Sequence, residues 1–406
     1  MAVILSGGAN ILVSEVYSMK LLHKFIVLIV ATALLISPVV STGSVAASGS
    51  VASTEFGAPS CILMEASTGL VLYEENADEA LPPASVTKIM TLLLVMEAVD
   101  DGRLDWEDMV TTSEYAASMG GSQVYLEAGE EMPVWEMVKC VVVASANDAA
   151  VALAEAIAGS EEAFVSMMNA RAAELGMTST HFENTNGLDD DTESHVTSAR
   201  DIAIMSRELI TKHPKILEYS SIWMDTIRNG EFGLTNTNRL IRFYRGANGL
   251  KTGSTAKAKF CISATAERDG MQLIAVIMAS PSRDERNESA KKLLDYGFAN
   301  WEVASLEPEP LDDLVLNGGV YPTLPIKYED SQLVLKKGSA AKLTKNLVLP
   351  ETIPAPVAAG DEVGKIEYLL DGEVVATLPI VAAEDRDRIG FGEVLSRFLR
   401  ALTLAG

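Results

Sequence analysis

One strongly hydrophobic segment follows a short turn near the first quarter of the chain. Residues 89–99 are apolar on nearly every face and are interrupted only by Thr91 and Glu97. A helix that is apolar all round is a buried helix, so this pattern predicts a helix inside a hydrophobic core. We expect the helix to begin at Ser85 and to end at Asp101-Gly102.

Strands and further helices are predicted on both sides of this segment. Short apolar runs bounded by Gly-containing turns are typical of strands, and amphipathic stretches are typical of helices. Strands are expected at residues 61–64, 70–73, 249–252, 260–265 and 273–278, and helices at residues 135–144, 148–157, 161–175, 198–212 and 290–301. This order predicts an α+β domain of residues 54–301, in which one antiparallel sheet joins the N- and C-terminal parts.

The pattern changes after residue 305. Glu307-Pro308-Glu309-Pro310 is typical of a linker, and short Val, Leu and Ile runs follow between Gly- and Asp-containing turns. This spacing predicts a small all-β domain of residues 305–383. It contains no cluster of reactive side chains, so we expect a spacer or docking domain.

The last residues, 386–406, have the pattern of an amphipathic helix. One helical face carries apolar residues, which are Val394, Leu395, Phe398, Leu399 and Leu402. The arginines of this segment lie on the other faces. Such a helix either binds a membrane surface in the plane of the interface or packs on its own protein. We expect the first, a membrane anchor.

The N-terminal residues 1–47 have the pattern of an upstream extension and a signal peptide. Basic residues at 20–24 precede an apolar run at 25–36, and small residues follow up to Ala47. This order predicts a secretory signal peptide, because the apolar run is short for a membrane-spanning helix. Met19 is the expected start, and the mature protein is expected to be exported.

Composition narrows the classes of partner and site. The net charge of −24 argues against electrostatic binding to nucleic acid, and 48% hydrophobic residues allow a substantial core. Three cysteines are too few and too scattered for a disulfide framework or a zinc site. We expect no metal ion or cofactor, and we expect buried free thiols at Cys61, Cys140 and Cys261, with a bridge between the first and last as the open alternative.

A hydroxyl and an amine lie three residues apart where the buried helix is expected to begin. Ser85 and Lys88 share one helical face, so the lysine amine is expected beside the serine oxygen inside the protein. A lysine acts as a general base near neutral pH only if its pKa falls by roughly 3 units, which burial and a nearby cation favour. The pair alone is weak evidence, because the same spacing occurs at Ser254 and Lys257, Ser289 and Lys292, and Ser339 and Lys342.

Two further motifs follow in the chain. Ser145-Ala146-Asn147 lies between two apolar helices, and Lys251-Thr252-Gly253 lies in a strand flanked by glycine. Separately, the first is explained as a helix cap and the second as an edge-strand charge. All three motifs in one chain are much harder to explain by chance.

With these motifs the chain resembles the serine penicillin-recognising enzymes, whose signatures are Ser-x-x-Lys, Ser-x-Asn and Lys-Thr-Gly. The resemblance is closest to low-molecular-mass penicillin-binding proteins of the D-alanyl-D-alanine carboxypeptidase type, and it is strongest over residues 54–301. Supporting segments are residues 81–91, 145–150, 182–188 and 249–253. The resemblance implies a β-lactamase/transpeptidase-like fold, followed by the β domain and the tail that the family often carries.

The resemblance also implies catalytic roles. Ser85 is expected to be the nucleophile that forms an acyl-enzyme, and Lys88 is expected to take its proton. Ser145 and Asn147 are expected to relay protons and to hold the substrate amide. The implied reaction removes the terminal D-alanine from the pentapeptide stems of peptidoglycan, at the extracytoplasmic face of the bacterial cytoplasmic membrane.

Substrate binding is implied for the third motif. Lys251 is expected to bind the terminal carboxylate of the substrate, beside Thr252 and Gly253, and to help keep the first lysine neutral. Backbone N–H groups of Ser85 and Ser254 are expected to form the oxyanion hole. β-lactams are the implied inhibitors.

The chain departs from the family pattern at two positions, and other classes fit it less well. Arg245 and Asn248 stand where proline and aspartate are expected, which bears on loop geometry or substrate preference.

A class A β-lactamase needs a Glu-x-x-Leu-Asn run between Asn147 and Lys251, and none is present. The Gly-x-Ser-x-Gly and His-Glu-x-x-His motifs of other hydrolases are also absent. D,D-endopeptidase activity, a β-lactam sensor without turnover and the oligomeric state stay open.

Overall fold

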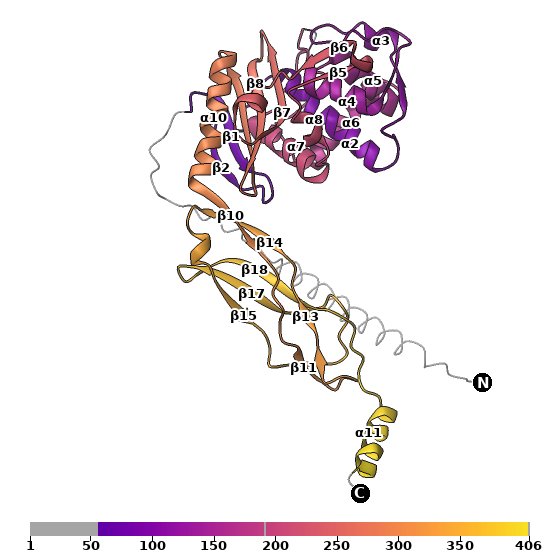
Figure 1. The fold of residues 1–406 in the computed structure, drawn as a ribbon, viewed down its shortest axis with the longest axis vertical. Helices are drawn as coiled ribbons and strands as arrows, with labels where there is room; N and C mark the ends of the chain where they lie inside the picture. Colours follow the sequence, from indigo (N-terminus) through magenta and orange to yellow (C-terminus); the bar gives the residue numbers. More distant parts are fainter. Residues whose placement is uncertain (1–55, 191, 405–406) are drawn as a thin grey trace, which may run out of the picture. The chain divides into compact units, whose positions relative to one another are not determined.

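The structure is a computed structural model that describes residues 56–190 and 192–404. The predicted upstream extension and signal peptide, residues 1–47, lie outside the described residues. The described chain forms an α+β part, then a β-rich region and a final helix (Figure 1). The predicted fold class is therefore confirmed.

An antiparallel sheet of five strands lies at the centre of the α+β part. Its strand order is β2-β1-β9-β8-β7. The strands are β1 Ser60–Glu65, β2 Val71–Glu75, β7 Ala247–Thr255, β8 Lys259–Arg268 and β9 Met271–Ser280. Because β1 pairs with β9, the sheet joins segments that are far apart in the sequence, as predicted.

Both faces of the sheet are covered, since successive side chains of a strand point to opposite faces. On one face Ile62 belongs to a core shared with α2 (Lys88–Asp100) and α7 (Ala199–Lys212). On the other face Leu63 belongs to a core shared with α10 (Arg283–Asn300). The helix that follows Ser85 is therefore buried, as its apolar pattern predicted.

Other elements complete the α+β part around the sheet. The longer ones are α4 Val134–Lys139, the π-helix η2 Cys140–Ala144, α5 Asn147–Ala158 and α6 Glu161–Glu174. The shorter ones are η1 Ala84–Thr87, β3 Met109–Thr111, α3 Glu114–Ala117, β4 Glu131–Pro133, α8 Ile216–Ser220, β5 Met224–Ile227, η3 Arg228–Gly230, β6 Phe232–Thr235 and α9 Leu240–Phe243.

Two helix starts differ from the prediction. Ser85 lies in the 3₁₀ turn η1, and the α-helix α2 begins only at Lys88. Helix α10 begins at Arg283, earlier than predicted, and the Ser282 hydroxyl accepts a capping hydrogen bond from the backbone of Glu285. The polar first turns of α10 carry little apolar pattern, which is why hydrophobicity alone did not indicate them.

The C-terminal region is β-rich. Its elements are β10 Trp301–Leu306, β11 Leu314–Asn317, β12 Thr323–Leu324, β13 Ile326–Lys327, β14 Ser331–Lys336, η4 Ala340–Lys342, β15 Thr344–Val348, β16 Thr352–Pro354, β17 Glu362–Leu370, β18 Glu373–Ala382 and the final helix α11 Phe391–Leu404. Strand β10 follows α10 directly and pairs with β14. The domain boundary near residue 305 stays a prediction.

The described residues also bear on cysteine pairing, metal binding and membrane-spanning helices. Cys61, Cys140 and Cys261 are free and buried, so the prediction of free thiols is confirmed and the alternative bridge is wrong. Within residues 56–190 and 192–404, His, Cys, Asp and Glu side chains form no group that could hold a metal ion. None of the helices described there combines the length and the apolar character needed to cross a bilayer.

The buried helix α2 predicts a graded loss of stability on truncation of its side chains. Leu93 is fully buried, so Leu93→Ala should lower the free energy of unfolding by about 2–5 kcal/mol. Val99, half-buried at the end of the same helix, is the matched control, and Val99→Ala should cost clearly less. Urea unfolding of both variants measures the difference, and equal losses would argue against a buried α2.

Candidate active site

Ser85 lies in the turn η1, which packs against strand β7. A Cβ on Gly253 would lie 2.8 Å from the Ser85 nitrogen and 2.8 Å from the Pro83 carbonyl oxygen. Only glycine permits backbones to approach this closely. The Lys-Thr-Gly strand is thus in direct contact with the turn that carries Ser85.

Three groups surround the amine of Lys88, which is fully buried. Its Nζ lies 2.5 Å from Asn147 Oδ1, 2.7 Å from the Asn186 carbonyl oxygen and 3.1 Å from Ser85 Oγ. The first two atoms only accept hydrogen bonds, because the Asn147 amide nitrogen donates instead to the Gly120 carbonyl. A neutral amine has two hydrogens and one lone pair. Its hydrogens therefore bind these two oxygens, and its lone pair is left for the Ser85 hydroxyl.

The surroundings of Lys88 favour this neutral form. Burial lowers the pKa of Lys88 well below its ordinary value of 10.5, and the charge of Lys251 lowers it further. The carboxylate of Asp148 acts in the opposite direction and raises it. An uncharged Lys88 in contact with Ser85 is able to accept the hydroxyl proton.

The Ser-x-Asn motif lies where the π-helix η2 ends and α5 begins. Ser145 has a left-handed backbone with φ of 63°, and its Oγ accepts a hydrogen bond of 2.8 Å from Lys251 Nζ. The N-cap residue of α5 is Ala146, and the side chain of Asn147 contacts Lys88 instead. The explanation of Asn147 as a helix cap is therefore wrong.

Lys251 on β7 is 1% exposed, so it is not an edge-strand surface charge. Besides Ser145, its Nζ donates to the Thr252 carbonyl oxygen at 2.7 Å. Burial, and secondarily the charge of Arg286, lower the pKa of Lys251 to about 7. Lys251 thus connects the third motif to the second and lies near enough to influence Lys88.

A cavity of about 170 Å³ opens beside these groups. It is lined by Ser85, Ser122, Ser145, Thr237, Thr252, Gly253, Ser254, Arg283 and Arg286. Lys88, Asn147 and Lys251 are buried and hydrogen-bonded to one another or to the serines of this lining. The structure therefore brings all the predicted site residues together.

Some lining residues fall outside the three motifs. Thr237 Oγ1 accepts a hydrogen bond of 2.7 Å from Thr252 Oγ1. Arg286 is 3% exposed, and its guanidinium donates to the side chain of Asn287 and the carbonyl of Cys261, whereas no carboxylate in the described chain accepts from it. A buried cation of this kind beside a cavity is suited to an anionic ligand. Its only sequence signal is a polar helix start, which is also typical of a solvated surface.

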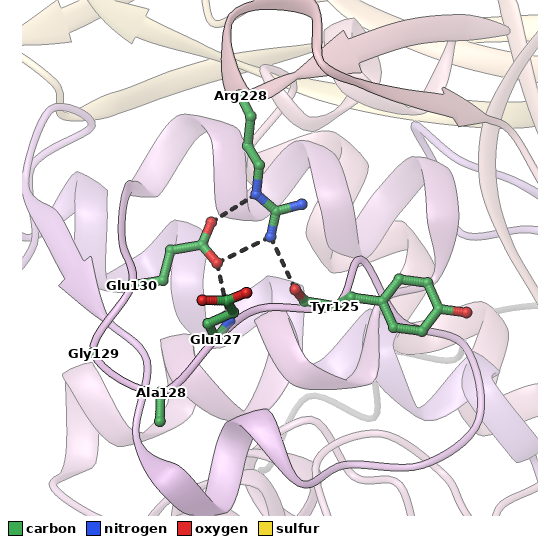
Figure 2. A pocket seen from close by; sticks show the side chains of 6 residues that line it. All are labelled: Tyr125, Glu127, Ala128, Gly129, Glu130 and Arg228. Carbon is green, nitrogen blue, oxygen red and sulfur yellow. Dashed lines mark hydrogen bonds and ion pairs between the residues drawn. The ribbon is translucent and has the colours of Figure 1, made fainter.

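The loop that carries Ser122 is held from its other side. Arg228 donates to both carboxylate oxygens of Glu130, at 2.7 and 3.0 Å, and to the Tyr125 carbonyl at 3.1 Å (Figure 2). The buried Asp148 accepts hydrogen bonds from two backbone N–H groups of the same loop. These contacts fix the position of the loop beside the cavity.

An antiparallel sheet covered by helices, with a buried lysine in contact with a serine beside a cavity, is an arrangement typical of serine hydrolases that pair the serine with a lysine. Residues 47–282 match the Peptidase S11 family model, described as D-alanyl-D-alanine carboxypeptidase, and residues 326–388 match the C-terminal domain of penicillin-binding protein 5. The chain belongs to this family and is a serine-type D-Ala-D-Ala carboxypeptidase.

Relatives and solved structures agree with this assignment. The chain is 43% identical to D-alanyl-D-alanine carboxypeptidase DacF of Bacillus subtilis, over 84% of this chain and 88% of the relative. It is 33% identical to DacC of Escherichia coli, over 85% and 88%. Penicillin-binding protein 5 of Haemophilus influenzae superimposes with a TM-score of 0.72 at 30% identity, over 82% of this chain and 98% of that chain. The predicted family resemblance is confirmed.

The low pKa of Lys251 predicts how stability changes with pH. The folded-state pKa is about 7, below the ordinary value of 10.5, so the unfolded chain binds more protons between these values. The contribution of Lys251 to stability therefore rises with pH across this window, by roughly 1.4 kcal/mol per pH unit. In Lys251→Met this rise should be missing.

Urea unfolding at several pH values measures this effect. The difference in unfolding free energy, Lys251→Met minus wild type, should decrease steadily as the pH is raised from neutral toward 10.5. Lys257→Met, at an exposed lysine, is the control and should show no such trend. A difference for Lys251→Met that does not depend on pH would contradict the prediction.

Proposed function

We propose that the chain removes the terminal D-alanine from peptidoglycan pentapeptide stems through an acyl-enzyme on Ser85. The main support is the environment of Lys88, whose buried amine contacts Ser85 Oγ at 3.1 Å. Both hydrogens of the neutral amine are engaged by carbonyl oxygens. The remaining lone pair makes Lys88 the general base that activates Ser85.

Acylation follows from this arrangement. Lys88 takes the hydroxyl proton as Ser85 Oγ attacks the carbonyl carbon between the two D-alanines, and the N–H groups of Ser85 and Ser254 bind the developing oxyanion. The C–N bond then breaks, and the leaving nitrogen receives the proton that Lys88 took from Ser85, relayed through Ser145, which is hydrogen-bonded to Lys251. Water hydrolyses the ester and restores Ser85.

The terminal carboxylate of the substrate is proposed to bind at the arginine end of the cavity. Arg283 and Arg286 line this cavity together with Thr252. Lys251, the residue expected from the sequence in this role, already donates hydrogen bonds to Ser145 and to a backbone carbonyl. The arginines therefore make the direct contacts, and Lys251 adds its charge.

β-lactams are proposed to acylate the same serine. Penicillin-binding protein D2 of Listeria monocytogenes, solved in ampicillin- and cefotaxime-bound forms, is 34% identical to this chain in the first form, with a TM-score of 0.55 over 60% of this chain and 98% of that chain. A sensor without turnover and a D,D-endopeptidase are the alternatives. The complete set of groups around Ser85 favours turnover.

Replacement of Ser85 tests this proposal. Ser85→Ala should reduce labelling by a fluorescent penicillin, and D-alanine release from a peptide ending in D-Ala-D-Ala, by more than about 1000-fold, because no oxygen is left to form the ester. Ser339→Ala, from a pair with the same spacing outside the site, should leave both unchanged. Gel fluorescence and a D-alanine assay measure the two reactions.

The possible results distinguish the carboxypeptidase from the two alternative functions. Labelling of wild type without D-alanine release would favour the sensor, and preferential cleavage of cross-linked peptide dimers would favour the endopeptidase. Penicillin labelling of Ser85→Ala would contradict the proposal.

We also propose that α11 anchors the protein at the extracytoplasmic face of the bacterial cytoplasmic membrane. Its apolar face is exposed, with Phe391 at 83% and Phe398 at 60%. A helix packed on its own protein would bury such side chains, so their exposure favours binding in the plane of a lipid interface. The predicted signal peptide supplies the route of export.

Truncation and point substitution of the tail test this anchor. Removal of residues 386–406 should shift the signal-cleaved protein from the membrane to the soluble fraction. Phe398→Glu should weaken flotation with phospholipid vesicles, because it puts a charge in the apolar face, whereas Ser396→Glu, off that face, should not. Retention of the truncated protein in the membrane fraction would refute anchoring by α11.

A further inference from the structure

A buried histidine lies behind the turn that carries Ser85 and takes no part in the proposed chemistry. His195 is 3% exposed; its Nδ1 lies 3.0 Å from the backbone nitrogen of Glu183, and its Nε2 lies 2.8 Å from Thr87 Oγ1. Because a backbone N–H only donates, Nδ1 is the acceptor. The proton of the neutral ring therefore lies on Nε2 and is donated to the Thr87 hydroxyl.

The Thr87 hydroxyl thereby acquires a fixed direction. Its oxygen accepts from His195, so its hydrogen is donated to the Ala84 carbonyl oxygen, 2.9 Å away. Ala84 precedes Ser85 and has a left-handed backbone with φ of 48°, which residues with a Cβ rarely adopt. Gly187 packs against the same carbonyl, since a Cβ there would lie 1.9 Å from the oxygen. The Thr87 hydroxyl and Gly187 therefore hold the peptide before Ser85 in this uncommon conformation.

Burial leaves the ring of His195 neutral. Burial lowers the pKa of His195 to about 4; the carboxylates of Glu183 and Asp189 oppose this shift, and His181 and Lys257 reinforce it. At neutral pH the ring therefore carries one proton. With Glu183 fixed as the donor to Nδ1, the direction of both hydrogen bonds does not change.

We propose that His195 is a positioning residue for acylation. Its Nε2–H orients the Thr87 hydroxyl, which holds the Ala84 carbonyl and so fixes the Oγ and the N–H of Ser85 toward the substrate. This inference rests on the proposed role of Ser85 as the nucleophile. If the role of His195 were only structural, its important hydrogen bond would be the one from the backbone of Glu183, which holds a surface loop in place.

Two substitutions separate the two hydrogen bonds. In His195→Gln the amide nitrogen lies near the position of Nε2 and donates to Thr87, whereas in His195→Asn the amide oxygen lies near Nδ1 and accepts from Glu183. His195→Asn should lower the penicillin acylation rate and kcat for D-alanine release by about 10- to 100-fold with little change in KM, and His195→Gln should stay within about 3-fold of wild type.

A second pair tests the same link from the other side and does not require His195 variants to fold. Thr87→Val should lose activity as His195→Asn does, and Thr87→Ser should keep it. The double variant His195→Asn/Thr87→Val should be no slower than either single variant, because both interrupt one chain of hydrogen bonds. Thermal unfolding confirms that each variant is folded.

Clear outcomes overturn the inference. These are equal losses in His195→Gln and His195→Asn, a loss in His195→Gln alone, or a folded Thr87→Val with wild-type rates. Ser85→Ala keeps the two proposals apart. Labelling of that variant would overturn the nucleophile itself, whereas an unlabelled Ser85→Ala beside a fully active His195→Asn would overturn only the positioning role.

Discussion

The active site depends on the burial of one amine without a carboxylate in contact with it. A charged ammonium at the position of Lys88 would lack both water and a counter-ion, so the folded protein favours the uncharged form. Asn147 Oδ1 and the Asn186 carbonyl then take both hydrogens, and the lone pair is left for Ser85. In the proposed mechanism, the fold thus obtains a base from a residue that is a cation in water at neutral pH.

The cations around the cavity influence one another's pKa values. Burial is the larger cause of both low pKa values; in addition, the charge of Arg286 lowers the pKa of Lys251, and the charge of Lys251 lowers the pKa of Lys88. The chain as a whole carries a net charge of −24, yet Arg283 and Arg286 both line the cavity. In the proposed mechanism, the positive potential that adds to the effect of burial on Lys88 also attracts the anionic end of the peptide, so substrate recognition and activation of the serine share an electrostatic contribution.

What could be predicted from the sequence was local. Ser85 and Lys88 lie one turn apart at the start of a helix whose apolar pattern already indicated burial, whereas Ser254 and Lys257 have the same spacing at the end of a strand, where it has no such meaning. The antiparallel sheet and most helices followed from periodicity. Arg286 could not be found in this way, because its position beside the cavity arises only when α10 packs on the sheet, and the polar start of that helix was missed for the same reason.

The buried carboxylate of Asp148 shows how geometry limits an unfavourable charge. Its charge raises the pKa of Lys88 and so opposes the neutral amine. Its oxygens, however, accept hydrogen bonds from the backbone N–H groups of Val124 and Leu126, at 3.1 and 3.0 Å, and it forms no ion pair with Lys88 in the described structure. The carboxylate therefore orders the loop that carries Ser122, while the amine keeps only uncharged partners. Had Asp148 contacted the amine directly, the ion pair would have favoured the ammonium and removed the lone pair that Ser85 requires.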